Sequence, residues 1–239
     1  MKKITLLTIA IGANYFIACS QISLKDIRKQ ADKAIKNDKS LTEGEIIGGL
    51  KEALTVGTNN SASKASKTDG FLKNPKIRIP FPPEAQKMEQ TLRQMGMNKQ
   101  VDKFVLTLNR AAEEASKSAA EVFIGAIKQM TIGDGLGILK GQDNAATKYL
   151  QDKTSSPLKK KFQPIVHDAL QKVEYTKYWF PLATAYNKIP FVEKMNPDIE
   201  DYTTTKALGG LFALIAEEEM KIRKDPMARV TDLLKKVFK

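Results

Sequence analysis

Apolar residues recur along the chain with a spacing near 3.6 residues, which is the period of an amphipathic α-helix. The longest stripe runs through residues 99–130, where Val101 and Phe104 begin one apolar side and a second apolar side indicates a central, mostly buried helix. Another long stripe follows Asp198 and extends to about Arg223. Alternating stretches are short and rich in proline, and no internal repeat is evident. The pattern therefore predicts an all-α fold in a single multi-helix domain.

Capping residues and prolines set the expected helix boundaries. Thr42 and Glu45 have the spacing of a capping box, so the helical domain is expected to start at Leu41. Proline starts or interrupts helices because it has no N–H to donate. We therefore expect a short helix over residues 144–153, capped by Asp143. A new helix is expected to start at Pro157, after Ser156, and to be kinked or split at Pro164. An aromatic helix over residues 175–191 is expected to break at Pro181, and a last helix to start at Pro226.

One proline-rich segment does not fit a helix. Residues 72–83 read LKNPKIRIPFPP, and their four prolines forbid helical structure. Within this segment, Ile77 and Ile79 alternate with Lys76 and Arg78, as in an extended chain with one buried face. We predict a short extended strap that lies across the helices.

The first 18 residues have the pattern of an export signal. Lys2 and Lys3 precede an uncharged apolar run over residues 4–18, which is too short for a permanent membrane span. Phe16-Ile17-Ala18-Cys19 then resembles a bacterial lipobox, in which the cysteine is acylated and becomes the first residue of the mature protein. The alternative is a simple secretory signal that is cleaved near Ala18.

The expected organisation follows from this leader. Residues 1–18 are a predicted lipoprotein signal peptide, residues 19–40 a tether, and residues 41–239 the helical domain. Ser20 follows the cysteine where aspartate would be the retention signal, so we expect an outer-membrane protein anchored by Cys19 on the periplasmic face. The expected partner is thus the membrane, through the lipid anchor.

The charge adds little to this expectation. The 239 residues carry a net charge of +12, which falls to +10 when Lys2 and Lys3 leave with the leader. Nucleic acid is not an expected partner, because the chain is predicted to be exported and has no zinc-finger or basic-zipper pattern. Scattered lysines favour simple solubility, with a weak attraction to anionic envelope surfaces as the further possibility.

Catalytic and metal-binding patterns are missing from the sequence. The chain has one histidine, His167, and no second soft ligand once the single cysteine is acylated, so no zinc site is expected. It has no G-x-S-x-G motif, and the glycines of residues 131–141 lack the spacing of a phosphate-binding loop. We therefore expect no metal and no cofactor, and name no catalytic residue.

Charged residues inside two apolar stripes are the one suggestive set. A buried charge needs a partner, so we predict that these side chains form one network between helices. The set could be an anion or acid/base site, but a polar clasp that holds three helices in register is favoured. Its members are Arg110, Glu113, Glu218, Glu219, Arg223 and Arg229.

Aromatic residues gather in the segment that starts at Tyr175. They could line an apolar groove for a ligand or an acyl chain, although ordinary core packing is favoured because aromatic side chains bury large areas. The members proposed for the groove are Tyr175, Tyr178, Trp179 and Phe180.

Five segments together resemble the bacterial domain-of-unknown-function family 4197. They are NPKIRIPFPP, NRAAEEA, ILKGQDNAATKYL, FQPIV and the long block from Thr203 to Phe238, and they span most of residues 41–239. The resemblance implies a helical, exported and often lipid-anchored protein with no assigned reaction. It carries over no catalytic residue. At Gly209 this chain departs from the aspartate expected of relatives.

The function expected from these observations is a non-enzymatic binding or structural module of the bacterial envelope. One alternative is a carrier that holds an apolar ligand in a groove between helices. A second is an enzyme that uses the buried arginine and glutamate cluster. A deep aromatic groove would favour the carrier, an open cleft containing the charges would favour the enzyme, and a closed core with satisfied charges would favour the module.

Overall fold

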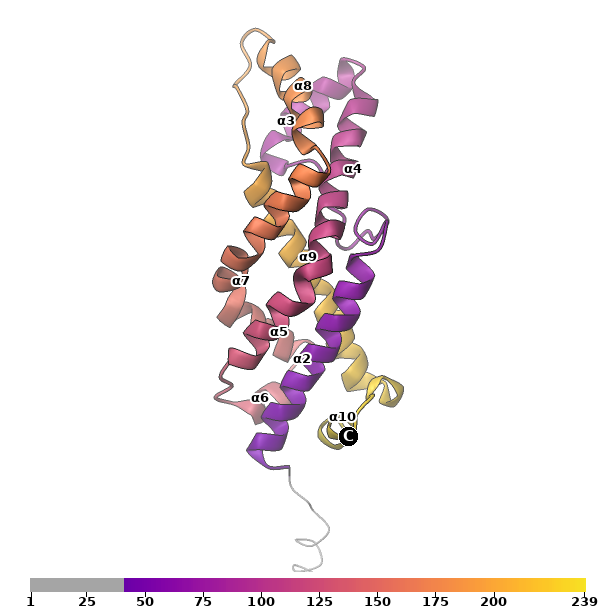
Figure 1. Ribbon diagram of the computed structural model, residues 1–239, viewed down its shortest axis with the longest axis vertical. Coiled ribbons are helices and arrows are strands. Elements are labelled where there is room, and N and C mark those ends of the chain that lie inside the picture. The colour runs from indigo at the N-terminus through magenta and orange to yellow at the C-terminus, as the bar shows by residue number, and fades with distance from the viewer. Residues whose placement is uncertain (1–40) are drawn as a thin grey trace, which may run out of the picture. The chain divides into compact units, whose positions relative to one another are not determined.

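The structure is a computed structural model that describes residues 41–239 (Figure 1). The predicted leader, Cys19 and the tether lie outside the described residues. All regular elements of the described residues are helical, and no strand occurs among them. The predicted all-α fold in one domain is therefore confirmed. The capping box is also confirmed, since Glu45 N–H donates to the Thr42 hydroxyl and Thr42 N–H donates to the Glu45 carboxylate.

Four long helices and several short ones make up this domain. In chain order the α-helices are α2 (Glu43–Ala65), α3 (Gln86–Gln94), α4 (Asn98–Ala115), α5 (Ala119–Gln129), α6 (Gly135–Leu139), α7 (Ala145–Lys172), α8 (Tyr175–Asn187), α9 (Ile199–Lys224) and α10 (Asp232–Val237). Short 3-10 turns are η1 (Pro83–Ala85), η2 (Ser116–Ser118) and η3 (Pro226–Ala228).

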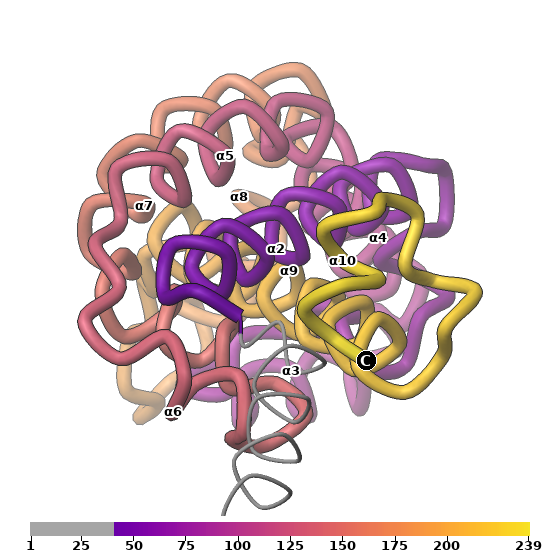
Figure 2. The backbone as a smooth tube through the Cα atoms, turned by 90° about the horizontal axis from the view of Figure 1, so that it is seen from below, coloured from indigo at the N-terminus to yellow at the C-terminus, as the bar shows by residue number. Residues whose placement is uncertain are grey.

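The late helix α9 lies at the centre of the packing. It contacts α2 on one side and α7 on another, while α4 contacts α7 and α8. Seen along the helices, α5 and α7 lie on one side of α2 and α9, and α10 lies on the other (Figure 2). Asp198 caps α9 as predicted, because its side chain accepts a hydrogen bond from the Asp201 N–H at 2.9 Å.

The strap is extended only in part. Its first half is made of turns, in which the N–H groups of Ile77 and Arg78 donate to the Asn74 carbonyl, and its last residue, Pro83, belongs to η1.

The alternation of burial predicted within the strap is confirmed. Ile77, Ile79 and Phe81 are buried, whereas Arg78 and Pro80 between them are exposed. The ring of Phe81 packs edge-on against Phe104 of α4, with ring centroids 5.4 Å apart. The strap pairs with no other strand in residues 41–239, so its backbone needs side-chain partners instead.

A glycine of α9 makes room for the residues at the start of the strap. A Cβ atom at Gly210 would lie 2.8 Å from the Phe71 ring and 3.1 Å from the Ile77 side chain. Because Phe71 is fully buried, the ring has no room to move away. The absence of a side chain at this one position thus lets the loop after α2 pack directly on α9.

The single helix predicted over residues 99–130 is wrong. The structure divides it into α4 and α5, joined by the 3-10 turn η2. Ser116, at the junction, is fully buried, and its hydroxyl donates to the Ala112 carbonyl at 2.7 Å. A serine that bonds back to the preceding turn competes with the regular helix and bends it.

The helix start predicted at Pro157 and the break predicted at Pro181 are also wrong, and Pro164 does not split its helix. Helix α7 continues through Pro157 and Pro164, and α8 continues through Pro181. Each interior proline removes one hydrogen bond and costs about 3 kcal/mol. All three are exposed, so the carbonyls that lose a partner lie on the outer face, where water can bond to them. On the inner face, buried residues such as Phe162 offset the cost.

The starts of α7 and of the last helix, α10, also differ from expectation. The short helix expected over residues 144–153 is the first part of α7, whose N-cap is Asn144 and not Asp143. Pro226 opens only the turn η3, and α10 begins later, where the Thr231 hydroxyl accepts a hydrogen bond from the Leu234 N–H. Val230, expected on that helix, precedes it and is 65% exposed.

Candidate functional site

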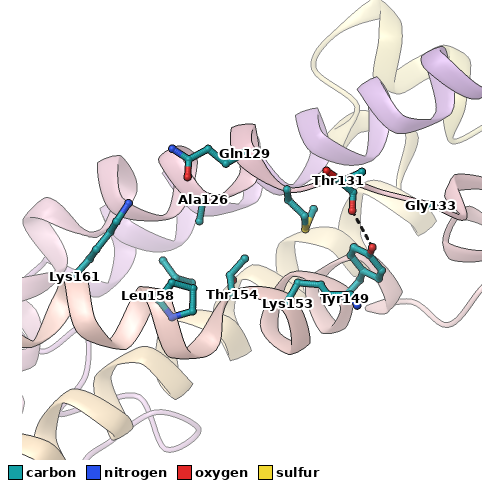
Figure 3. Close-up of a pocket in the computed structure, with 11 residues that line it drawn as sticks. Ala126, Gln129, Thr131, Gly133, Tyr149, Lys153, Thr154, Leu158 and Lys161 are labelled. Atoms are coloured by element: carbon teal, nitrogen blue, oxygen red, sulfur yellow. Dashed lines mark hydrogen bonds between the residues drawn. The ribbon is translucent and has the colours of Figure 1, made fainter.

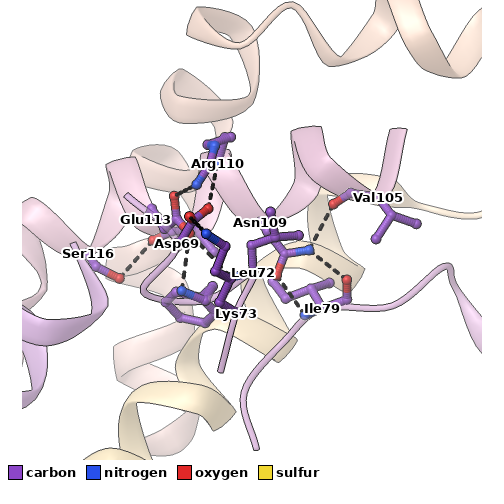
Figure 4. Close-up of polar contacts among 11 residues, drawn as sticks. Asp69, Leu72, Lys73, Ile79, Val105, Asn109, Arg110, Glu113 and Ser116 are labelled. Carbon is purple, nitrogen blue, oxygen red and sulfur yellow. Dashed lines mark hydrogen bonds and ion pairs between the residues drawn. The ribbon is translucent and has the colours of Figure 1, made fainter. Parts of the chain in front are cut away.

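A row of polar side chains on α4 holds the strap (Figure 4). The buried Asn109 accepts a hydrogen bond from the Ile79 N–H at 2.9 Å and donates to the Ile79 carbonyl at 2.8 Å. It also donates to the Val105 carbonyl at 2.8 Å. One amide side chain therefore pairs with both polar groups of a strap residue, as a neighbouring strand would.

One turn later, Glu113 holds the start of the same segment. Its carboxylate accepts hydrogen bonds from the N–H groups of Phe71 at 3.1 Å and Leu72 at 3.3 Å, and it pairs with Arg110 at 2.5 Å. Arg110 also reaches Asp69 at 2.7 Å (Figure 4). The hydrogen bonds that Arg110 donates to Asp69 and Glu113 raise the pKa of Arg110, so this guanidinium stays charged.

Glu219 of α9 is a second glutamate that binds backbone groups, and it is fully buried. Its carboxylate accepts hydrogen bonds from the N–H groups of Ala146 at 3.0 Å and Thr147 at 2.7 Å, and from the Thr147 hydroxyl at 2.7 Å. Since Asn144 makes no side-chain cap, this carboxylate satisfies the free N–H groups at the start of α7.

Arg223 extends this contact to a third helix. It pairs with Glu219 at 2.8 Å and donates to the carbonyls of Leu139 at 2.6 Å and Ile138 at 3.1 Å, at the end of α6. Its side chain is only 9% exposed. The Glu219–Arg223 pair therefore joins the end of α6 and the start of α7 to the middle helix.

Glu218 faces α2 instead. Asn60 donates to its carboxylate at 2.8 Å, Lys221 donates at 2.6 Å, and Lys64 forms a third contact. Burial would raise the pKa of Glu218, but the hydrogen bonds from Lys221, Lys64 and Asn60 outweigh it and lower the pKa to about 2. The carboxylate is thus ionised throughout the physiological range.

This shift predicts a pH-dependent contribution to stability. The pKa is lower in the folded state, so the stabilisation is complete above the unfolded value of 4.5 and is lost as the pH falls toward 2. Because both lysines are half-exposed, solvent screening limits the effect to about 2 kcal/mol. Urea unfolding of wild type and Glu218→Gln should show that difference at pH 6 and little at pH 2.5. A difference that stays constant with pH would contradict it.

The six charged residues therefore do not form one network. Arg110 and Glu113 bind the strap, Glu218 binds α2, and Glu219 with Arg223 joins α6 and α7. Arg229 donates to the carbonyls of Ile222 and Arg223, both at 2.9 Å, and so caps the end of α9. Within residues 41–239 no hydrogen bond links the α4 pair to the α9 residues. The predicted single network is replaced by separate contacts, each with backbone or lysine partners.

The aromatic residues proposed for a groove are not arranged around one. Trp179 is buried, and its ring lies 5.0 Å from Phe104 and 6.1 Å from Phe81. Phe180 points the other way and is 62% exposed, while Tyr175 and Tyr178 are half-buried. None of these four lines any of the clefts found in residues 41–239. The Trp179 position is core packing.

A cleft that the sequence did not predict lies between α5 and α7 (Figure 3). Its volume is about 580 Å³, within the range of small-molecule sites. The upper wall is the end of α5 and the segment after it, and the lower wall is α7. The lining residues are Ala126, Gln129, Met130, Thr131, Gly133, Tyr149, Lys153, Thr154, Pro157, Leu158 and Lys161.

Other candidates for chemistry are few among the described residues. His167 pairs with Glu200 at 2.8 Å on the surface, and this hydrogen bond raises the pKa of the histidine. No group of three or more His, Cys, Asp or Glu side chains within residues 41–239 could hold a metal ion. In the same part of the chain, no helix combines the length and the apolarity needed to cross a membrane.

Comparison with known families gives one match. The model of the family described as "Protein of unknown function (DUF4197)" matches residues 40–239. The chain belongs to the DUF4197 family. No curated protein and no solved structure matches the chain. The resemblance read from the sequence is confirmed as far as the family, and membership brings no reaction, so function in this DUF4197 chain has to be argued from its own geometry.

Several residues of this DUF4197 domain escaped the sequence reading. Asn60 and Lys64 complete the Glu218 contact, yet on α2 they have the pattern of surface residues. Lys153 and Lys161 line the cleft, and eight residues of spacing puts them on one face of a helix. The spacing of the two lysines is visible in the sequence. That they line a cleft is not, because the cleft exists only where α5 packs opposite this face of α7.

Proposed function

We propose that this DUF4197 protein is an envelope lipoprotein whose helical domain is a non-enzymatic binding module. The observation that carries the proposal is that its inward-facing charges are all engaged in structural contacts. Glu113 and Glu219 accept hydrogen bonds from backbone N–H groups, and Arg223 donates to backbone carbonyls. These are the groups that an acid/base site would have used.

The enzymatic alternative, which relies on the arginine and glutamate cluster, has little support from the geometry. A general acid or base has to reach a substrate atom within hydrogen-bond distance. Four of the main clefts in residues 41–239 are lined by no member of the arginine and glutamate set. A closed core with satisfied charges is what a binding or structural module requires.

The carrier alternative keeps one supporting observation in a different place. The aromatic helix offers no groove, but the cleft between α5 and α7 has an apolar floor and a size suited to a small ligand. This observation favours ligand binding over a purely structural role.

Anchoring by Cys19 rests on the sequence. A thiol directly after an apolar leader receives a diacylglycerol, and each buried methylene adds about 0.8 kcal/mol to membrane binding, so several acyl chains anchor durably. The absence of aspartate after the cysteine supports the periplasmic face of the outer membrane as the location, with the membrane as the partner.

Replacing Cys19 tests this part of the proposal. We expect Cys19→Ala to abolish acylation and processing before residue 19, because the modified thiol is what directs cleavage. Mass spectrometry of the wild-type protein should show an acylated N-terminal cysteine, and membrane fractionation should place it with the outer membrane. Ser20→Ala is the matched control and should keep both properties. An unmodified Met1 on wild-type protein from the cell interior would contradict the proposal.

The non-enzymatic part has its own test. Arg110→Lys keeps a positive charge beside Asp69 and Glu113. The folded variant should therefore support the same cellular phenotype as wild type. A reaction catalysed by the purified wild-type protein, and lost in this variant without loss of folding, would contradict a binding module.

A further inference from the structure

We propose that the cleft between α5 and α7 binds a single-chain anionic amphiphile, an acyl chain with a carboxylate head. The inference rests on the proposed function, since it names the ligand of the binding module. It commits to one ligand molecule per cleft and to the cleft shown in Figure 3.

The floor of the cleft is apolar. Met130 and Leu158 form it from opposite walls and are buried, at 6% and 1% exposed, although the cleft is open. Ala126 and the exposed ring of Pro157 continue the apolar surface to the rim. A methylene chain laid along this floor would remove these groups from water, which is favourable in proportion to the area covered.

The charges at the cleft are positive. Lys153 and Lys161 lie eight residues apart on α7, which places them about 12 Å apart along the helix axis. Neither ammonium forms a salt bridge in residues 41–239, whereas the nearby Lys159 pairs with Asp201 at 2.6 Å. The lining residues include no aspartate or glutamate. An anionic ligand thus meets two cations without displacing an acidic partner.

The backbone does not reverse this charge. The C-terminus of α5 lies at the upper wall and would favour a cation through its free carbonyls. However, Lys51 donates to the Lys128 carbonyl at 3.1 Å, and the Tyr149 hydroxyl donates to the Thr131 carbonyl at 2.8 Å. The Lys128 carbonyl belongs to α5 and the Thr131 carbonyl to the segment after it. The helix terminus amounts to about half a negative charge against two ammonium groups, so the lysines decide the sign of the charge in the cleft.

The two ends of the cleft differ in whether their lysine is already engaged, and this difference indicates which end binds the head group. Figure 3 shows Lys161 reaching from α7 toward α5 in the half of the cleft where Gln129 lies. An ammonium and an amide N–H from facing walls can both donate to one carboxylate. At the other end, the Lys153 ammonium lies 5.6 Å from the centre of the Tyr149 ring, a cation–π contact that already occupies it. The head is therefore placed at Lys161 and the chain runs toward Tyr149.

The chain's own tether is a poor occupant. Residues 20–40 contain six Lys or Arg against three Asp, so their net charge has the same sign as the cleft. A protein embedded by acyl chains at a membrane surface works instead among molecules that are themselves acyl chains with charged heads. An acidic amphipathic peptide is the competing occupant and is kept as an outcome of the test.

Photolabelling of the full-length acylated protein tests the site. The protein is reconstituted in vesicles of zwitterionic phosphatidylcholine, a diazirine derivative of palmitate is added, and labelled peptides are identified by mass spectrometry. We expect saturable labelling of peptides from α5 and α7 that line the cleft. Palmitate should compete, and the uncharged hexadecanol should compete at least about tenfold more weakly, because it lacks the charge-assisted contact.

Two matched charge reversals separate the site from the general basic surface. Lys161→Glu should weaken labelling about tenfold or more, since it replaces attraction by repulsion at the head. Lys160→Glu makes the same charge change one residue away, at an exposed position outside the cleft, and should leave labelling unchanged. Ala126→Phe should block the apolar floor and lower labelling without any change of charge.

The outcomes distinguish the two proposals. Equal loss in both lysine variants, or labelling outside α5 and α7, would overturn the cleft site. Displacement of the label by an acidic leucine-rich peptide, together with no competition by palmitate, would overturn the ligand class. If the protein is acylated and at the outer membrane but shows no cleft labelling, this inference fails and the lipoprotein assignment stands. If it is unacylated yet binds palmitate, the reverse holds.

Discussion

Replacing Glu219 with alanine is expected to lower the free energy of unfolding by about 3–5 kcal/mol, because it leaves a buried guanidinium without its partner. The Arg223 side chain is 9% exposed and pairs with Glu219 at 2.8 Å. The same substitution removes the acceptor for the N–H groups of Ala146 and Thr147 at the start of α7. Urea unfolding of the full-length protein, followed by circular dichroism, measures the change.

A neighbouring glutamate provides the control. Glu217 is two residues earlier on α9, is 30% exposed at its side chain, and pairs with Lys76, which is 69% exposed. Surface pairs of this kind contribute about 0–1 kcal/mol, so Glu217→Ala should change the unfolding free energy by no more than that. Similar effects of the two substitutions would mean that the Glu219 contact does not hold α7.

A double substitution separates the ion pair from the cap. Replacing Glu219 with leucine and Arg223 with methionine removes both charges and keeps apolar volume, which commonly restores stability lost from a buried pair. Here we expect only partial recovery. The carbonyls of Leu139 and Ile138 and the first N–H groups of α7 would still lack their partners.

The elements that could be read from the sequence are those decided by neighbours in the chain. Thr42 and Asp198 cap helices through residues three positions later, and Ile77 and Ile79 alternate in burial within a few residues. All the residues that produce such a signal lie within a few positions of one another in the sequence. They suffice for the all-α class, the capping box and the burial pattern of the strap, but not for the turns in its first half.

The errors arise where tertiary packing outweighs a local signal. Pro157 and Pro181 carry a real cost in a helix, but each lies on an exposed face of a helix whose other face is buried. The opposite happens at Ser116, where no proline or glycine marks the bend between α4 and α5. Its buried hydroxyl donates to the Ala112 carbonyl, but Thr154 and Thr203 make the same kind of bond within unbroken helices, so this signal does not mark a junction in the sequence.

The buried glutamates of the candidate site were predictable from the sequence, but their partners were not. A glutamate within an apolar stripe must find partners, which identified Glu113, Glu218 and Glu219. Glu113 and Glu219 accept from backbone N–H groups of distant segments, such as those of Phe71 and Thr147. Backbone groups occur at every position, so no residue type in the sequence points to them.

These contacts share one structural role. Asn109, Glu113 and Glu219 each satisfy backbone groups of a segment that lacks a regular partner there. Glu219 does so for the start of α7, and Asn109 does so for the strap. In a domain whose described residues include no sheet, an extended segment can be held only by side chains or water.

Asn109→Ala is expected to release the strap and to lower the unfolding free energy by about 2–3 kcal/mol, since the N–H and the carbonyl of Ile79 would both remain buried without a partner. Hydrogen exchange at the Ile79 amide should accelerate about thirtyfold or more, as a loss of 2 kcal/mol implies. Asn98→Ala, at the exposed start of the same helix, is the control and should leave Ile79 protected. Unchanged exchange at Ile79 in Asn109→Ala would show that the strap is held by apolar packing alone.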